Sequence, residues 1–184
     1  MHDLIPDIIR HHLGDAEFSL LTTEDSGTEP SDAPSSLHCH RYYEIHCNTG
    51  HRKRLSLPTG EILLEPEQFL LICPGCMHYS DPFMDRHCVL SFELRQVKGE
   101  SGFYNHFLEL MNGLNLRPLP LNRKFRVAMD AFTSAEPERT VMDFCKRKLL
   151  ALTVLVALLE NLSACSSRRD RTYTPPRYTF WVCF

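Results

Sequence analysis

The pattern of hydrophobic and polar positions changes its period once along this chain. Between Leu37 and Leu94, short apolar runs are separated by turn residues such as Gly50 and Pro66. Turn signals at intervals of about 8–12 residues are typical of an all-β block, and about seven or eight strands fit here. After Gly102, apolar residues recur every three or four positions, as on one face of a helix. The pattern therefore predicts strands followed by helices.

Three elements are predicted ahead of this block. Residues 6–14 place a proline near the start and Gly14 at the end of an apolar stripe, which predicts a short amphipathic helix. Residues 17–23 read as a strand. Residues 24–36 are acidic and rich in Ser and Pro, so they predict a loop.

Within the β block, two segments are particularly informative. Residues 54–57 and 61–64 flank Pro58-Thr59-Gly60, which predicts a hairpin. Phe69 to Cys73 is a continuous apolar run, as expected for a strand that is buried on both faces.

Three helices are predicted after the β block. The first contains Phe103 to Met111 and ends at Asn112-Gly113, and the second covers residues 122–135. The third covers residues 138–164 and is apolar nearly all round in its middle, so protein must contact it on more than one side. Its unbroken apolar stretch, residues 149–159, is shorter than the roughly 20 residues that span a bilayer. We expect a buried helix and no membrane partner.

Composition narrows the class of protein. A chain of 184 residues allows one domain plus a tail. Twenty basic and 23 acidic side chains give a net charge of −3, so this segment alone has no cationic field for nucleic acid. The chain has eight cysteines, but its amino terminus begins acidic and is followed by no apolar signal-peptide core. We therefore expect reduced thiols and a cytoplasmic location.

Candidate chemistry is concentrated between His38 and Cys47. In a strand, alternate side chains share a face, so this segment would place one polar set together: His38, His40, Tyr42, Glu44 and His46. A strand that faces solvent seldom carries such a set. We expect it to line a pocket in which imidazole and carboxylate groups converge on one ligand.

A further histidine, His78, follows the turn signal Pro74-Gly75. Together with His38, His40 and Glu44 it makes a set of three nitrogens and one oxygen, which suits a divalent transition metal such as Zn, Ni, Fe or Mn. The alternative is a polar pocket that holds an organic ligand without metal. No cofactor is therefore certain from the sequence.

The pair Cys73 and Cys76 has the spacing of a zinc or redox motif. A four-thiolate zinc site needs a second such pair, and the residues after Cys76 read as turn and strand rather than as the helix of a thioredoxin-type site. We interpret both as structural thiols.

The motif HxHxxxE from His38 to Glu44, then Gly50, the hairpin and the run FLLICPGCMH resemble the two signature motifs of cupin β-barrels. The resemblance implies metal ligands at His38, His40, Glu44 and His78. The sequence departs from the cupin pattern at Glu67, where glycine is usual, and at Pro74-Gly75 in place of Pro-x-Gly.

Residues 17–165 resemble, more narrowly, the amino-terminal sensor and dimerisation region of AraC-type transcription regulators. The matching segments are HCHRYYEIHCNTG, LLICPGCMH, VLSFEL and FYNHFLEL, followed by the long Leu-rich helix. The resemblance implies an α+β fold, a cupin-like antiparallel β-barrel (jelly roll) followed by a helical dimerisation segment. The expected units are residues 1–100 for the barrel with an N-terminal arm, 101–165 for the dimerisation helices and 166–184 for a linker and truncated stub.

Two functions remain open. The first is a sensor that binds a small sugar-, polyol- or carboxylate-like effector through His38, His40, Tyr42, Glu44 and His78 and forms a homodimer through residues 138–164. It would reach DNA only through a helix-turn-helix module that this chain lacks, and it would not be an enzyme. The alternative is a small metal-dependent cupin enzyme, a dioxygenase or isomerase, that uses His38, His40, Glu44 and His78 as ligands.

Overall fold

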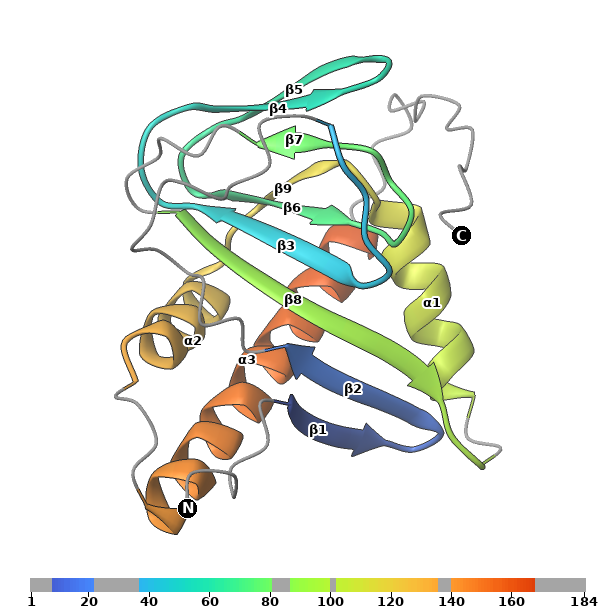
Figure 1. The fold of residues 1–184 in the computed structure, drawn as a ribbon, viewed down its shortest axis with the longest axis vertical. Helices are drawn as coiled ribbons and strands as arrows, with labels where there is room; N and C mark the ends of the chain where they lie inside the picture. The colour runs from blue at the N-terminus through green and yellow to red at the C-terminus, as the bar shows by residue number, and fades with distance from the viewer. Residues whose placement is uncertain (1–7, 22–36, 81–86, 100–101, 136–139, 168–184) are drawn as a thin grey trace.

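The fold combines two antiparallel sheets with three helices in the part of the chain that this computed structural model describes (Figure 1). The described residues are 8–21, 37–80, 87–99, 102–135 and 140–167. The α+β class expected from the sequence is confirmed. The predicted loop at 24–36 and nearly all of the predicted linker at 166–184 lie outside these ranges.

The larger sheet has six strands and brings together segments that are far apart in sequence. Its order is β1 (Ile8–Leu13), β2 (Ala16–Leu21), β8 (His87–Gln96), β3 (Tyr43–Asn48), β6 (Gln68–Ile72) and β9 (Pro118–Pro120). The strand β3 is therefore central, paired with β8 on one side and β6 on the other. Central pairing fixes its backbone on both edges.

The smaller sheet has the order β5 (Gly60–Leu64), β4 (Lys53–Leu57) and β7 (Tyr79–Ser80). Leu57 pairs with Gly60, so the predicted hairpin is confirmed. The expected cupin-like β-barrel is found in part: within the described residues its strands form two antiparallel sheets, and the hydrogen-bonded ladders of β4, β5 and β7 do not join those of the larger sheet.

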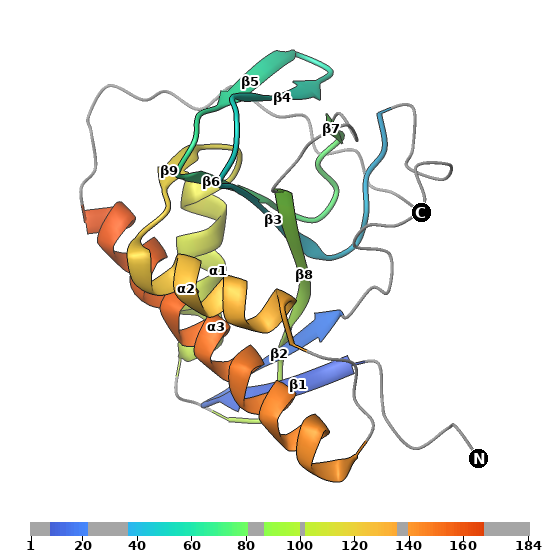
Figure 2. The same cartoon turned by 90° about the vertical axis from the view of Figure 1, so that its left-hand side faces the viewer.

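The helices are α1 (Phe103–Leu114), α2 (Arg123–Thr133) and α3 (Val141–Ser167), and they lie on one side of the larger sheet (Figure 2). Asn122 caps α2, since its side-chain oxygen accepts a hydrogen bond from the backbone N–H of Phe125 at 2.8 Å. The helix α3 packs against α2, α1 and β1. All three helices occur close to where the sequence predicts them.

The predicted helix at residues 6–14 is wrong. Residues 8–13 form strand β1, which pairs with β2 through a tight turn at Gly14-Asp15. Gly14 has a φ of 61°, so the glycine that resembled a helix cap serves a hairpin turn instead. A single short helix is marginal without tertiary contacts, whereas pairing with β2 satisfies the backbone along the whole segment.

The helix α3 is long and apolar enough to cross a membrane by length and composition, a test that the core helices of soluble proteins also pass. The unbroken apolar stretch at residues 149–159 is therefore only part of the apolar length of α3. In the fold one face of α3 is buried, and the buried residues are Ala151, Val154, Leu155, Ala157, Leu158, Asn161, Leu162 and Cys165.

All six residues of β3 are buried, so both of its faces are covered. Tyr43 lies on the helix side, since its ring stacks on Phe92 with centroids 5.2 Å apart, and Phe92 contacts Phe18, which packs against Phe107 of α1. Cys47 lies beside residues of α2. Side chains alternate along a strand, so Glu44 and His46 point to the opposite side, away from the helices. This side of β3 carries the candidate site.

Candidate metal centre

Three imidazole nitrogens surround one carboxylate oxygen. The Oε2 atom of Glu44 lies 2.9 Å from Nε2 of His40, 3.0 Å from Nε2 of His46 and 3.2 Å from Nε2 of His78. The side chains of these residues are at most 12% exposed. Together with His38, which groups with His40 and His78, we call them the imidazole–carboxylate cluster.

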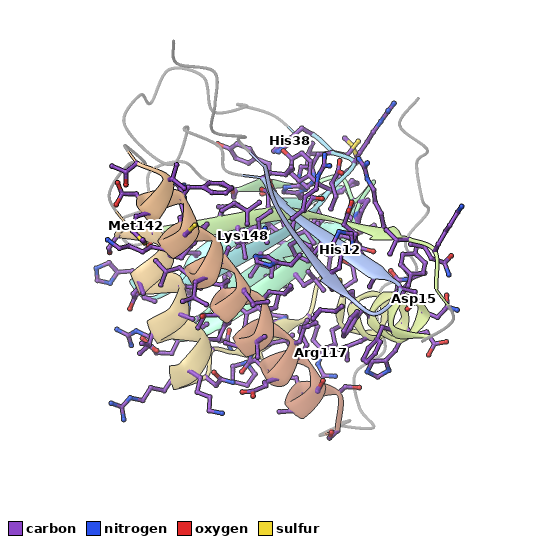
Figure 3. All side chains as sticks on the ribbon, turned by 90° about the horizontal axis from the view of Figure 1, so that it is seen from below. His12, Asp15, His38, Arg117, Met142 and Lys148 are labelled. Carbon is purple, nitrogen blue, oxygen red and sulfur yellow. The ribbon has the colours of Figure 1, made fainter. Side chains whose placement is uncertain are left out.

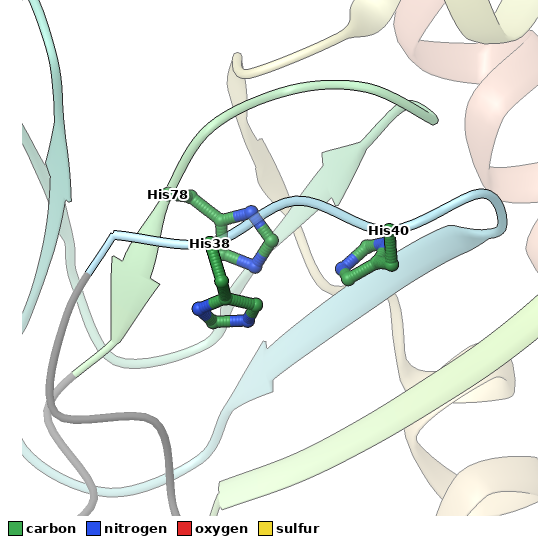
Figure 4. A group of neighbouring side chains, drawn as sticks. All are labelled: His38, His40 and His78. Carbon is green, nitrogen blue, oxygen red and sulfur yellow. The ribbon is translucent and has the colours of Figure 1, made fainter. Parts of the chain in front are cut away.

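Two short backbone segments carry the histidines outside β3. His38 and His40 precede the strand, which corrects the prediction that the whole 38–47 segment is one strand. His38 forms an isolated bridge with His78, in which each backbone N–H donates to the other's carbonyl at 3.0 and 2.9 Å. Gly75 N donates to the His40 carbonyl at 2.9 Å. These bonds hold two distant segments of the chain together. Figure 4 shows the neighbouring rings of His38, His40 and His78.

Backbone carbonyls select the tautomer of two of the histidines. Nδ1 of His40 lies 2.9 Å from the Tyr42 carbonyl oxygen, and Nδ1 of His78 lies 3.0 Å from the Cys76 carbonyl oxygen. A carbonyl only accepts, so Nδ1 must carry the proton and donate it. In the neutral ring Nε2 then presents a lone pair, and in both residues this atom lies within 3.2 Å of Glu44 Oε2. This is how metal-binding histidines are commonly held.

The donor set fits a metal cation. Two lone pairs facing a carboxylate oxygen repel it unless a cation or a proton lies among them. Nε2 of His40 is buried and has no hydrogen-bond partner among the described residues, although it lies 2.9 Å from Glu44 Oε2. Neighbouring donors in an octahedral site with bonds of about 2.1 Å lie about 3.0 Å apart, as these do.

The pKa shifts in the cluster favour the protonation states that bind a cation. Burial by itself would raise the pKa of Glu44, but His40, His46 and His78 hold that pKa well below its usual range. Burial lowers the pKa of His46, and the carboxylate of Glu44 only partly opposes this. Glu44 is therefore ionised and His46 neutral at pH 7, which are the forms that bind metals.

The structure places the predicted site residues as follows. His40 and His78 contact Glu44, and His38 groups with His40 and His78 but not with Glu44; metal or effector binding by these residues stays a prediction. Tyr42 stacks on His40 with ring centroids 4.1 Å apart and planes at 2°. His46 was placed on the shared face but left out of the ligand set, although its position two residues after Glu44 in a strand was the signal that could have found it.

The thiols of Cys73 and Cys76 are buried and free, as expected for structural cysteines. Burial raises the pKa of Cys73, whose Sγ faces the Met111 carbonyl at 3.7 Å. Six described cysteines are free and Cys39 is disulfide-bonded, so the expectation of reduced thiols holds for those six alone.

The two departures from the cupin motifs have different local causes. Glu67 has a φ of 59°, a left-handed conformation in which glycine is usual. Its backbone N–H donates to Asn48 and its carbonyl accepts from Leu121, both at 2.8 Å, which holds this turn in place. Gly75 also has a positive φ, 78°, and donates to His40. The turn chemistry of the second motif is therefore present despite the changed residues.

Comparison with known proteins adds only a general likeness. No protein-family profile matches the chain, and no curated protein matches it. Similar solved structures include a cupin protein from Bacteroides fragilis, with 21% identity over 55% of this chain and 84% of that one and a TM-score of 0.24. PhpD with cadmium has 14% identity over 84% of this chain and 48% of its own, with a TM-score of 0.26.

A 2-hydroxyethylphosphonate dioxygenase has 13% identity over 93% of this chain and 50% of its own, also with a TM-score of 0.26. The chain thus spans about half the length of PhpD and of this enzyme. The prediction that the chain is not an enzyme is corrected here, because the similar structures include a Streptomyces albus dioxygenase with Fe(II) bound. At these TM-scores the likeness assigns no activity or substrate to this chain.

Proposed function

We propose that this chain is a cupin-like domain that binds a divalent transition metal on the sheet face of β3, and that the bound metal receives a small organic ligand. The observation that carries this proposal is the convergence of three Nε2 atoms on Glu44 Oε2 within 3.2 Å. A buried carboxylate with so many imidazoles around it is costly unless a cation balances it. Imidazole-rich sets suit Zn, Ni, Cu and Fe.

A side chain of this protein can also bind the organic ligand next to the metal. Burial, and then the nearby charge of Glu44, raise the pKa of Tyr42, so its phenol stays protonated at neutral pH. This half-buried hydroxyl can donate a hydrogen bond to an oxygen of a sugar-, polyol- or carboxylate-like molecule. When bound, a metal would supply Lewis-acid polarisation of such an oxygen, as an isomerase requires, whereas a dioxygenase would also need a redox-active metal such as Fe.

The test compares two glutamates that differ in burial. Wild-type protein, purified without a tag or chelator, is expected to carry close to one transition metal ion per chain by elemental analysis. Glu44→Gln removes the buried charge and is expected to lose that metal. Glu61→Gln, at an exposed ion pair with Arg54, is the control and should keep it. A metal-free wild type under metal-replete conditions would refute the proposal.

A second function, the sensor and dimerisation domain of an AraC-type regulator, is favoured by the outer face of α3. Six apolar residues of α3 follow heptad spacing and are exposed or half-buried: Met142, Cys145, Leu149, Leu152, Val156 and Leu159. Figure 3 shows Met142 at the outer side of this helix. A heptad seam of this kind is typical of helices that pair with another helix.

This seam borders a mainly apolar groove of about 780 Å³ between α2 and α3, to which Val127 and Val156 contribute. A second copy of the chain offers the same seam and is the simplest partner. Effector binding at the imidazole–carboxylate cluster would then favour one arrangement of the two copies.

Analytical ultracentrifugation tests the pairing of α3 helices. The wild type is expected to be a dimer and Leu149→Lys a monomer, because the new charge lies in the middle of the seam. Asn105→Lys adds the same charge at an exposed position of α1 and should leave the dimer intact. A wild type that sediments as a monomer at all concentrations would refute this function.

A further inference from the structure

We propose that His46 is a metal ligand together with Glu44 and His78, whose donor atoms all lie within 4.8 Å of one another, with His40 beside them at 2.9 Å from Glu44. We also propose that His38 supports the site through its backbone rather than through its imidazole. This inference rests on the proposed metal function. It departs from the motif HxHxxxE, in which the first histidine is a ligand and the position two residues after the glutamate is not specified.

The position of His46 supports its assignment as a ligand. Its Nε2 lies 3.0 Å from Glu44 Oε2, and the residue is 5% exposed. It lies in the middle of β3, opposite Leu70 of β6 and Val89 of β8. Strands paired on both edges hold side chains rigidly, and a rigid donor loses little entropy when it binds an ion.

The position of Glu44 links His46 to the other ligands. Residues two apart in a strand share a face, so His46 and Glu44 reach the same space from one element. The ion pairs that Glu44 makes within the described part of the chain are with His40, His46 and His78. His40 and His78 approach from the two segments that the backbone bridge joins, which gives three nitrogens and one oxygen.

His38 has a different role in the fold. It lies outside the strands and is half-buried. Its backbone N–H and carbonyl both bind His78, at 3.0 and 2.9 Å. Its ring leans over that of His78, with centroids 4.6 Å apart (Figure 4). A ring nitrogen of His38 lies within 4.8 Å of donor atoms of His40 and His78, but His38 does not belong to the group formed by Glu44, His46 and His78. The bridge that places His78 needs the backbone of residue 38 and not its imidazole, so we expect that removing this ring leaves Glu44, His46 and His78 in place.

The experiment compares two histidine truncations in the full chain. Apo protein is titrated with Co²⁺ while its ligand-field absorption is recorded, for the wild type, His46→Ala, His38→Ala and the exposed control His106→Ala. We expect His46→Ala to weaken Co²⁺ binding about 10-fold or more and to change the spectrum. His38→Ala is expected to stay within about 3-fold of the wild type, with an unchanged spectrum, since only a lost ligand changes the coordination.

Two further measurements separate a ligand from a supporting group. His46→Gln keeps a hydrogen-bond donor for Glu44 but lacks the imidazole, and it should bind as weakly as His46→Ala. If His46→Ala does not fold, His46→Gln still measures how much the imidazole contributes to metal binding. Pulsed electron paramagnetic resonance of the Cu²⁺-loaded protein should detect one imidazole fewer in the His46 variants and an unchanged number in His38→Ala.

Three outcomes would overturn the inference. Wild-type affinity in His46→Gln would make His46 a hydrogen-bond donor only. Loss of binding in His38→Ala with normal binding in His46→Ala would restore the ordinary motif. A wild type that binds neither Co²⁺ nor Cu²⁺ would remove the proposed function and this inference together, whereas the first two outcomes leave the metal function standing.

Discussion

Nδ2 of Asn161 on α3 donates a hydrogen bond to the carbonyl oxygen of Pro120 at 3.0 Å, which ties the longest helix to the edge strand β9. The Oδ1 atom of Asn161 also accepts from the backbone N–H of Asn122 at 3.3 Å. Asn161 is 2% exposed, whereas Asn122 is half-buried and Pro120 exposed. Without this side chain, two backbone groups would lose their hydrogen bonds to α3, and the buried space of the amide would be left empty.

We therefore expect Asn161→Ala to lower the free energy of unfolding by about 1–3 kcal/mol in urea titrations. Ser163→Ala, an exposed position on the same helix, is the matched control and should change it by less than about 0.5 kcal/mol. Equal effects of the two substitutions would show that the Asn161 contacts contribute nothing specific.

Lys53 should be a destabilising residue. Its amine is buried without a hydrogen-bond partner among the described residues, and burial lowers its pKa to about 8. The unfolded chain, with a lysine pKa of about 10.4, binds more protons between about pH 8 and 10.4, so stability should rise with pH in that window.

Lys53→Met should stabilise the protein by about 1–3 kcal/mol at pH 7 and flatten this pH dependence. The measurement is urea unfolding at pH 7, 8.5 and 10. Lys124→Met, at an exposed ion pair with Glu160, should change stability by less than about 1 kcal/mol at every pH. A loss of stability on replacing Lys53 would mean that its amine has a favourable partner.

Metal removal should lower the melting temperature. A metal that binds only the folded protein stabilises it in proportion to the logarithm of its concentration over its Kd, or about 2.7 kcal/mol at 100 times Kd. Differential scanning calorimetry with and without a chelator should show a drop in Tm for the wild type. In Glu44→Gln the chelator should have no effect, and an equal drop there would mean that the metal binds elsewhere.

Replacing Gly14 and Gly113 by alanine should change the stability of the protein in opposite directions. Gly14 has a φ of 61° in the β1–β2 turn, so Gly14→Ala should cost about 1–2 kcal/mol. Gly113 lies in α1 with open space around the position of a new Cβ, so Gly113→Ala should stabilise by about 0.5–1 kcal/mol. Thermal unfolding of both variants measures this, and a neutral Gly14→Ala would contradict the hairpin.

Local chemistry made much of the fold predictable. The hairpin of β4 and β5 follows from Pro58-Thr59-Gly60, the buried strand β6 from its unbroken apolar run, and α2 from the cap at Asn122. Strand β1 was missed because its apolar spacing fits a helix equally well, and pairing with β2 decided between the two. Strand β9 was also missed, since a three-residue strand with two prolines has no local signature.

The site was predictable in its residue types but not in its geometry. Alternation along a strand correctly grouped Glu44 with His46, but it also placed His38 and His40 in that strand, where they do not lie. Their approach to Glu44 depends on the turn before β3 and on the backbone bridge to His78. A bridge across forty residues is a long-range contact, which periodicity does not encode.

The sequence by itself determined the block of strands between residues 37 and 94, the three helices after it, and the presence of imidazoles beside a glutamate, because these follow from the spacing of side chains along the backbone. The tertiary structure alone decided that β1 is a strand, that the sheets stay separate, and that His46 reaches the same carboxylate oxygen as His40 and His78. Each of these depends on which distant segments pair, and pairing is settled by the total burial and hydrogen bonding of the whole chain.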